Sequence, residues 1–138
     1  MRFHSEYPRF KLLTPLLRKR WLTQVILIEK KQPGTLNFIF CSDDYLFGIN
    51  KQYLQHDYFT DIITFDYTEG RCISGDLFIS IDRVRDNALT LKTDFETELS
   101  RVLVHGVLHL LGHSDKGPAL KALMRKKEDK YLSLLGKK

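Results

Sequence analysis

Residues 105–115 read HGVLHLLGHSD and concentrate metal-ligating side chains in an otherwise apolar run. His105 and His109 are four residues apart, so on a helix their imidazoles lie one above the other and can converge on one ion. Such a pair often arises by chance, and a histidine on an apolar helix face is more often a hydrogen-bonded core residue. The glycine, third histidine and aspartate that follow make a metal site the favoured interpretation.

The third ligand must come from beyond the helix. On an unbroken helix His113 would lie about 12 Å along the axis from His105, too far for both rings to bind one zinc ion at about 2.1 Å. Gly112 can end the helix, because glycine adopts the left-handed cap conformation without strain. Beyond that turn either His113 or Asp115 can return toward the ion. Three protein ligands with an open fourth position describe a catalytic zinc site better than a structural one.

Composition indicates a globular protein of one domain, residues 1–138, with 43% hydrophobic and 28% charged residues. No apolar run approaches the ~20 residues of a membrane span, and the N-terminus lacks the apolar core of a signal peptide. We therefore expect a cytoplasmic protein with no membrane contact and no organic cofactor. Cys41 and Cys72 are far apart in the chain and are interpreted as ordinary thiols.

The formal charge is +5, and many basic residues fall in the last quarter of the chain. Among them are Lys121, Arg125, Lys126 and Lys127. Taken alone, such a cluster is usually the solvated face of a helix. Beside a hydrolytic centre the same charges can hold phosphates, so Lys121, Arg125 and Lys126 are candidate substrate-binding residues.

Hydrophobic spacing predicts an α+β fold, with a small mixed β-sheet of about four strands packed with about five helices. We expect strands within residues 1–10 and over 36–41, 61–67 and 73–81, the last two as an antiparallel hairpin. The first helix should start at Thr14 and Pro15 and stop at a turn over residues 32–34. Further helices are expected after residue 42, from residue 82, from a cap at Thr93 or Asp94, and over 119–135.

Three stretches resemble the YbeY family of bacterial rRNA maturation factors. They are HGVLHLLG at 105–112, NKQYLQHDYFTDIITFDY at 50–67 and SGDLFIS at 74–80, and they occur in the family's order and spacing. The resemblance implies a metallohydrolase with one Zn²⁺ ion, a single-strand-specific endoribonuclease that acts in small-subunit rRNA 3′ end processing and ribosome quality control. It also implies precursor rRNA and the ribosome or ribosomal proteins as partners.

The resemblance further implies which residues form the site. The family's third metal ligand stands ten positions after the first histidine, which is Asp115 here. The turn at Gly112 favours the same residue, because His113 lies too close to it. Where the family has an arginine, this chain has Leu54, and His56 is the candidate catalytic acid or phosphate ligand in its place. A loop histidine with no such role is equally common.

Other matches to family positions are weaker. Asp57, Thr60, Asp61 and Asp76 could line a groove, although an aspartate in such a loop more often fixes a turn. A function of another class also stays open, namely a non-catalytic ribosome-assembly factor with a structural zinc that binds rRNA or a ribosomal protein. Gly106 replaces the glutamate of the zincin pattern HExxH, and with Leu54 it favours this alternative. The missing glutamate also weakens the interpretation as a metalloprotease.

Overall fold

The computed structural model describes residues 1–54 and 60–136 of the chain. Within these residues the order of elements is β1 (Arg2–Ser5), α1 (Pro15–Ile28), β2 (Gln32–Cys41), α2 (Asp43–Leu54), β3 (Ile62–Asp66), β4 (Cys72–Ser80), α3 (Ile81–Leu91), α4 (Phe95–Leu110) and α5 (Pro118–Gly136). The described part of the chain thus holds four strands and five helices, which confirms the predicted α+β fold class.

The four strands form one mixed sheet in the order β1-β2-β4-β3. β1 pairs in parallel with β2, and β2 pairs in parallel with β4. β3 runs antiparallel to β4, with Ile62 opposite Ile79. The mixed sheet and the final hairpin are as predicted, and β1 lies at one edge of the sheet.

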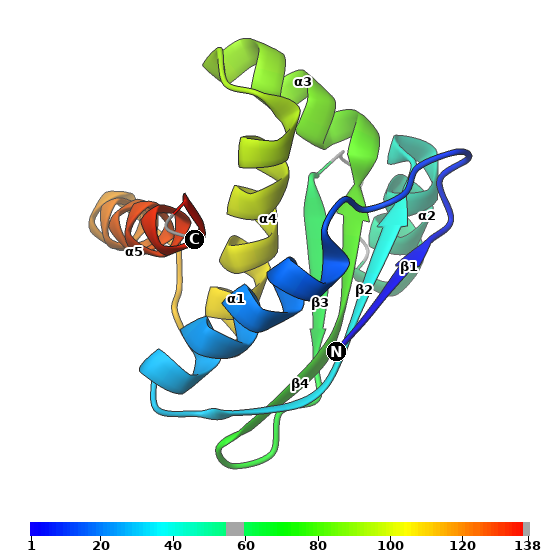
Figure 1. The fold of residues 1–138 in the computed structure, drawn as a ribbon. Coiled ribbons are helices and arrows are strands. Elements are labelled where there is room, and N and C mark those ends of the chain that lie inside the picture. Colours follow the sequence, from blue (N-terminus) through cyan, green and yellow to red (C-terminus); the bar gives the residue numbers. More distant parts are fainter. Residues whose placement is uncertain (55–59, 137–138) are drawn as a thin grey trace.

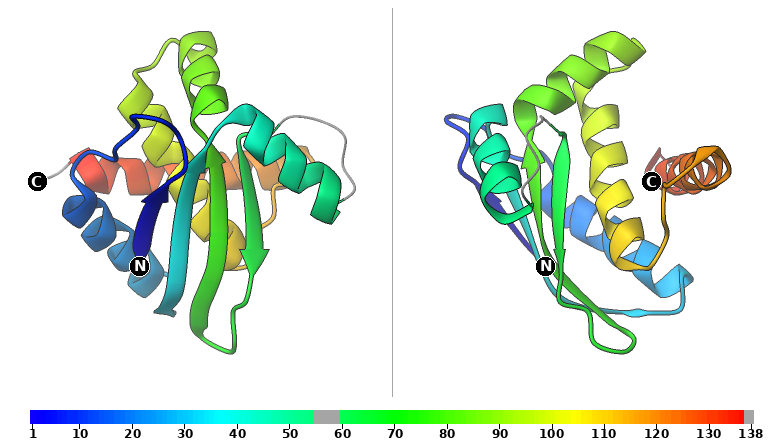
Figure 2. Two further views of the ribbon diagram at one scale, coloured as in Figure 1. Left: turned by 90° about the vertical axis from the view of Figure 1, so that its right-hand side faces the viewer. Right: turned by 180° about the vertical axis from the view of Figure 1, so that it is seen from behind.

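The helices cover the two faces of the sheet unequally (Figure 1). In Figure 2, α1 and α4 lie on one face, α2 lies on the other, and α5 packs on the side of α4 that faces away from the sheet. The main hydrophobic core lies between the sheet and α1 and α4, and fully buried side chains from both layers meet in it, including Leu22, Ile26, Phe38, Leu77, Leu103 and Leu108. α4 is therefore sandwiched between the sheet and α5.

The turn predicted at residues 32–34 is wrong, because β2 already begins there. These residues pair with the start of β4, and the register shifts before Leu36. A Cβ atom on Gly34 would lie 2.2 Å from the Ser74 Oγ atom, so glycine is what allows the strands to approach this closely. The chain reverses earlier, at Lys30, which has a φ angle of 63°.

Helix starts agree with the sequence in part. Pro15 occupies the first turn of α1, but the side chain of Thr14, which was expected to cap this helix as the residue before Pro15, makes no cap hydrogen bond, and its φ angle is 47°. The Ser80 side chain caps α3. For α4, the Asp94 carboxylate accepts a hydrogen bond of 2.6 Å from the Thr97 backbone N–H, which selects Asp94 as the cap.

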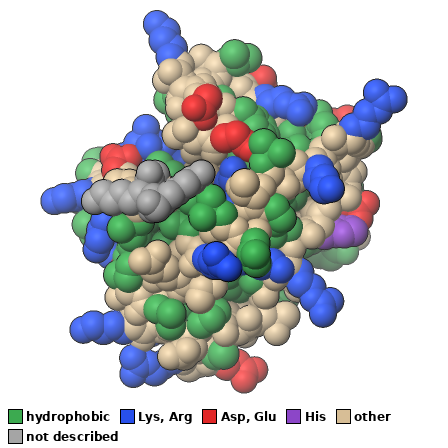
Figure 3. Space-filling model, viewed as in Figure 1, with side chains coloured by type: hydrophobic (Ala, Val, Ile, Leu, Met, Phe, Trp, Pro, Cys, Tyr) green, Lys and Arg blue, Asp and Glu red, His purple; other side chains and the backbone are tan. Residues whose placement is uncertain are grey.

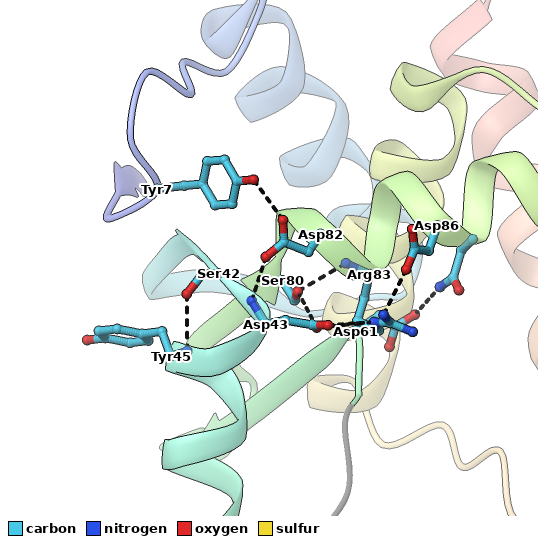
Figure 4. Close-up of polar contacts among 10 residues, drawn as sticks. Tyr7, Ser42, Asp43, Tyr45, Asp61, Ser80, Asp82, Arg83 and Asp86 are labelled. Carbon is cyan, nitrogen blue, oxygen red and sulfur yellow. Dashed lines mark hydrogen bonds and ion pairs between the residues drawn. The ribbon is translucent and has the colours of Figure 1, made fainter.

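A polar network joins the N-terminal segment to α2 and α3 where β2 and β4 end (Figure 4). The Asp82 carboxylate accepts hydrogen bonds from the Tyr7 hydroxyl at 2.7 Å and from the Asp43 backbone N–H at 2.8 Å. The Arg83 guanidinium pairs with the Asp43 carboxylate at 2.9 Å. These contacts fix α3 and hence the direction in which α4 returns across the sheet.

α4 lies unusually close to β3 and β4 at Gly106. A Cβ atom at this position would lie 2.6 Å from the Ile62 Cδ1 atom and 2.6 Å from the Leu77 Cδ2 atom. The space beside His105 is therefore filled by the sheet. A glutamate at this position, as in the HExxH pattern, would have no room.

We expect Gly106→Ala to lower the free energy of unfolding by about 1–3 kcal/mol, because the added methyl group must displace buried side chains. Gly48→Ala in α2 is the matched control, since a Cβ atom there meets nothing within 4 Å. It should raise stability by about 0.5–1 kcal/mol through helix propensity. Urea unfolding of both variants checks this, and equal effects would contradict the close approach.

Candidate metal centre

α4 presents its two histidines at the border between core and solvent. Their neighbours Val104, Val107 and Leu108 are buried, whereas the side chains of His105 and His109 are 23% and 31% exposed. The helix repeat produces this arrangement, because residues i and i+4 share a face that turns away from the sheet. The imidazoles therefore have a packed base and an open side.

The three predicted metal ligands converge. The His105 Nε2 atom lies 3.0 Å from the His109 Nε2 atom, and the Asp115 Oδ2 atom lies 3.5 Å and 3.6 Å from these two nitrogens. Two ligands about 2.1 Å from a tetrahedral zinc ion are roughly 3.4 Å apart, so all three distances suit one ion. Among the residues that the structure describes, these three form the only cluster of histidine, cysteine and carboxylate side chains with this geometry.

A glycine turn brings Asp115 to the histidines. Gly112 has a φ angle of 98°. Its N–H donates to the His109 carbonyl and the His113 N–H donates to the Leu108 carbonyl, both at 3.0 Å. This pair of bonds is the Schellman motif, which ends a helix with a left-handed residue. The chain reverses there, and Asp115 comes back over the last turn of α4.

A buried carboxylate on α5 holds His105 from behind. The His105 Nδ1 atom lies 2.6 Å from the Glu128 Oε2 atom, and the side chain of Glu128 is only 6% exposed. The other oxygen of Glu128 accepts a hydrogen bond of 3.0 Å from Arg101. Since a carboxylate accepts hydrogen bonds, the proton of neutral His105 resides on Nδ1 and the Nε2 lone pair faces His109 and Asp115.

The two histidines differ in basicity. Burial alone would lower the pKa of His105, but the hydrogen bond and the charge of Glu128 outweigh it and raise that pKa. The pKa of His109 is lowered, first by burial and then by the neighbouring His105. A basic and well-oriented His105 is the stronger electron donor to a metal.

His113 serves the site without joining the cluster. Its Nε2 atom lies 2.7 Å from the Glu29 Oε1 atom at the end of α1. The other Glu29 oxygen accepts hydrogen bonds from Lys127 at 3.0 Å and from the Tyr131 hydroxyl. Glu29 thus ties the loop that carries Asp115 to α1 and to α5. Lys127 is engaged here rather than free to meet phosphates.

The remaining predicted site residues are less closely associated with the centre. His56 and Asp57 lie outside the described residues. Lys121, Arg125 and Lys126 are exposed on α5, and Arg125 lines a cavity that His105 also lines. On the face drawn in Figure 3, lysine and arginine side chains stand apart rather than in one patch. Leu54 ends α2 and is 39% exposed.

Sequence reasoning missed the two carboxylates that support the centre. Glu128 stands between Met124 and Tyr131 on the buried face of α5, at spacings of four and three residues. A charged residue within an apolar helical stripe was the available signal. Glu29 offered no such signal, because its partners lie 84 to 102 residues away in the chain.

The Glu29 network makes stability depend on pH. Burial alone would raise the pKa of Glu29, but hydrogen bonds from Tyr131, His113 and Lys127 lower it from 4.5 to about 2. A lowered pKa stabilises the fold above pH 4.5, and this contribution is lost as the pH falls toward 2. Glu29→Gln should therefore reduce the free energy of unfolding at pH 7 by on the order of 1–3 kcal/mol and by less at pH 3.

Denaturant unfolding at the two pH values measures this difference. Glu69→Gln, which changes an exposed carboxylate near the β3–β4 turn, is the control and should have little effect at either pH. A Glu29→Gln penalty that is the same at both pH values would contradict the expected role of the ionised carboxylate.

Comparison with known proteins places this geometry in a family. The family described as Endoribonuclease YbeY matches residues 13–136. The endoribonuclease YbeY of Parabacteroides distasonis is 50% identical over 125 residues, which cover 88% of both chains. That of Flavobacterium psychrophilum is 55% identical over 114 residues, which cover 83% of this chain and 81% of the relative.

A solution structure of a Thermotoga maritima protein matches the fold with a TM-score of 0.66 at 26% identity, and covers 98% of this chain and 89% of that one. The matched family range contains all three members of the metal cluster and both supporting carboxylates. The sequence resemblance is thereby confirmed, and the chain belongs to the endoribonuclease YbeY family.

Proposed function

We propose that this protein is a zinc-dependent, single-strand-specific endoribonuclease. Its relatives carry the name endoribonuclease, which supports hydrolysis of RNA phosphodiester bonds. The observation that carries the metal dependence is the convergence of His105, His109 and Asp115 on one point that is open to solvent. Two imidazoles and one carboxylate, with an open fourth position, fit a catalytic zinc ion.

Each group has a role in this proposal. When bound, zinc would acidify a water molecule and polarise a phosphoryl oxygen. His105, His109 and Asp115 hold the ion, and Glu128 orients His105 through its Nδ1 proton. Arg125, with Lys121 and Lys126 on the same helix, is the candidate contact for RNA phosphates. His56 remains the candidate acid, because Leu54 cannot supply a cation or a proton.

We also propose a biological setting, which rests on the resemblance to the family. We assign the protein to small-subunit rRNA 3′ end processing and ribosome quality control in the cytoplasm, with precursor rRNA and the ribosome as partners. Residues 1–138 would act as one metallohydrolase domain. Among the described residues, no helix is both long and apolar enough to cross a membrane.

A ribosome-assembly factor with a structural zinc is the competing function. In that case the task of the ion would be to hold α5 against α4. However, Arg101 and His105 of α4 already bind Glu128 of α5, and Tyr131 and Lys127 of α5 already bind Glu29 at the end of α1. α5 is therefore held against α4 and α1 by polar contacts of its own, in addition to its buried Met124 and Tyr131, which favours a catalytic role for the ion.

Metal removal tests the function directly. A chelator should abolish cleavage of a single-stranded oligoribonucleotide, while circular dichroism shows an unchanged fold and added zinc restores the activity. Loss of structure together with loss of zinc would support the assembly factor instead. Full cleavage by protein shown to be metal-free would contradict the proposal.

The ligand assignment has its own test. His105→Ala, His109→Ala and Asp115→Ala should each weaken zinc binding by tenfold or more, because each removes a ligand. His113→Ala is the matched control: its ring is held by Glu29, so we expect a smaller loss. Glu128→Gln should weaken binding by about 10–100-fold, the effect of losing an orienting carboxylate. Competition titration with a zinc indicator measures all five variants, and a His113→Ala loss larger than that of Asp115→Ala would overturn the assignment.

A further inference from the structure

A cavity of about 260 Å³ adjoins the metal cluster on the side of α3. It is bordered by the start of β3 and by α3, α4 and α5, and His105 belongs to both the cavity and the cluster. Pockets that hold whole drug-sized ligands measure roughly 300–1,000 Å³, so this one suits a single planar ring system. A ligand here would sit next to whatever the metal cluster binds.

The cavity contains a hydrogen-bond acceptor that no described residue uses. Glu98 lines it and is only 4% exposed, and its Oε1 atom has no hydrogen-bond partner among the described residues. Asp61, which also lines the cavity, accepts a long bond of 3.3 Å from the Asn87 amide (Figure 4). Leaving a buried carboxyl oxygen unpaired is unfavourable, so Glu98 favours a ligand with N–H donors.

The donor set argues against a second metal ion. Within the described part of the chain, the carboxylates of Asp61 and Glu98 do not join a cluster of three ligand atoms within 4.8 Å. Arg101 and Arg125 line the same cavity and would repel a cation. A neutral, planar hydrogen-bond donor needs no third ligand atom and is not repelled by the arginines, since a guanidinium can stack on its face.

Nucleobases differ in the donors that they offer. A carboxylate accepts two parallel N–H donors, and guanine presents such a pair from its ring N1–H and its 2-amino group. Adenine presents one amino group beside an acceptor nitrogen, which a carboxylate would repel. Proteins that recognise single-stranded RNA bind an unstacked base by hydrogen bonds to its Watson–Crick edge.

We propose that this cavity binds a guanine base next to the scissile phosphate, with the carboxyl of Glu98 accepting its N–H donors, Asp61 beside it and Arg125 against its face. The inference rests on the proposed endoribonuclease function and adds a base preference to it. Val102 and Leu91 supply the apolar wall that a ring requires. Glu128 takes no part, because His105 and Arg101 occupy its oxygens.

Cleavage of designed oligonucleotides tests the preference. The zinc-loaded protein receives single-stranded oligoadenylates that contain one guanosine, or inosine in its place, which lacks the 2-amino group. We expect cuts to concentrate beside guanosine, about tenfold faster than beside inosine or adenosine. Glu98→Gln should abolish this preference, because an amide presents one donor and one acceptor.

Glu96→Gln is the matched control. Glu96 lies on the same helix and also has a buried oxygen without a partner, but it lines a different cavity and pairs with Arg18. This variant should keep the preference. Asp61→Asn is a second test that should weaken it, and thermal unfolding monitors the fold of each variant.

The outcomes separate the two proposals. Even cutting along the chain by the wild-type protein, or an unchanged preference in Glu98→Gln, would overturn the guanine site and leave the ribonuclease function intact. Absence of cleavage by every protein would instead contradict the ribonuclease function. Calorimetry on the zinc-loaded protein, with guanosine monophosphate and adenosine monophosphate as ligands, tests the guanine site independently. Tighter binding of guanosine monophosphate that is lost in Glu98→Gln supports the site, and equal binding of the two nucleotides overturns it.

Discussion

The close approach of α4 to the sheet at Gly106 is the constraint on which the candidate metal centre depends. Because no side chain separates the helix from Ile62 and Leu77, the backbone of α4 lies directly on β3 and β4. The neighbouring His105 is then at the border of the core, and His109 follows one turn later on the same side. A larger residue at this position would have to displace the side chains of Ile62 and Leu77 or shift the helix that carries both imidazoles.

Two carboxylates from distant parts of the chain complete this arrangement. Glu128 reaches His105 from α5, and Glu29 reaches His113 from the end of α1. Both also bind a cation, so neither negative charge is buried without compensation. The same contacts attach α5 to the remainder of the fold. The positions of the candidate metal ligands and the packing of the last helix are therefore set by the same hydrogen bonds.

Much of the fold and of the ligand cluster could be predicted from local sequence. Helical spacing placed His105 and His109 on one face, and Gly112 marked the turn that returns Asp115. The turn predicted at residues 32–34 failed because Pro and Gly signals were read without knowing that β4 lies alongside. Glu29 and Glu98 were missed for a related reason: their importance comes from partners, or from a lack of partners, that only the tertiary structure reveals.

The two arginines near His105, Arg101 and Arg125, have different roles. Arg101 is 17% exposed and binds both Glu128 and Asp129. Its charge therefore holds α5 and polarises the carboxylate behind His105. Arg125, one turn before Glu128, is exposed at the mouth of the adjoining cavity. With Leu54 in place of the family arginine, Arg125 is the cation best placed to meet RNA in the proposed function. The proposed ligand set, which includes Asp115, would increase this need, because an anionic ligand reduces the positive charge that a bound metal offers to a phosphate.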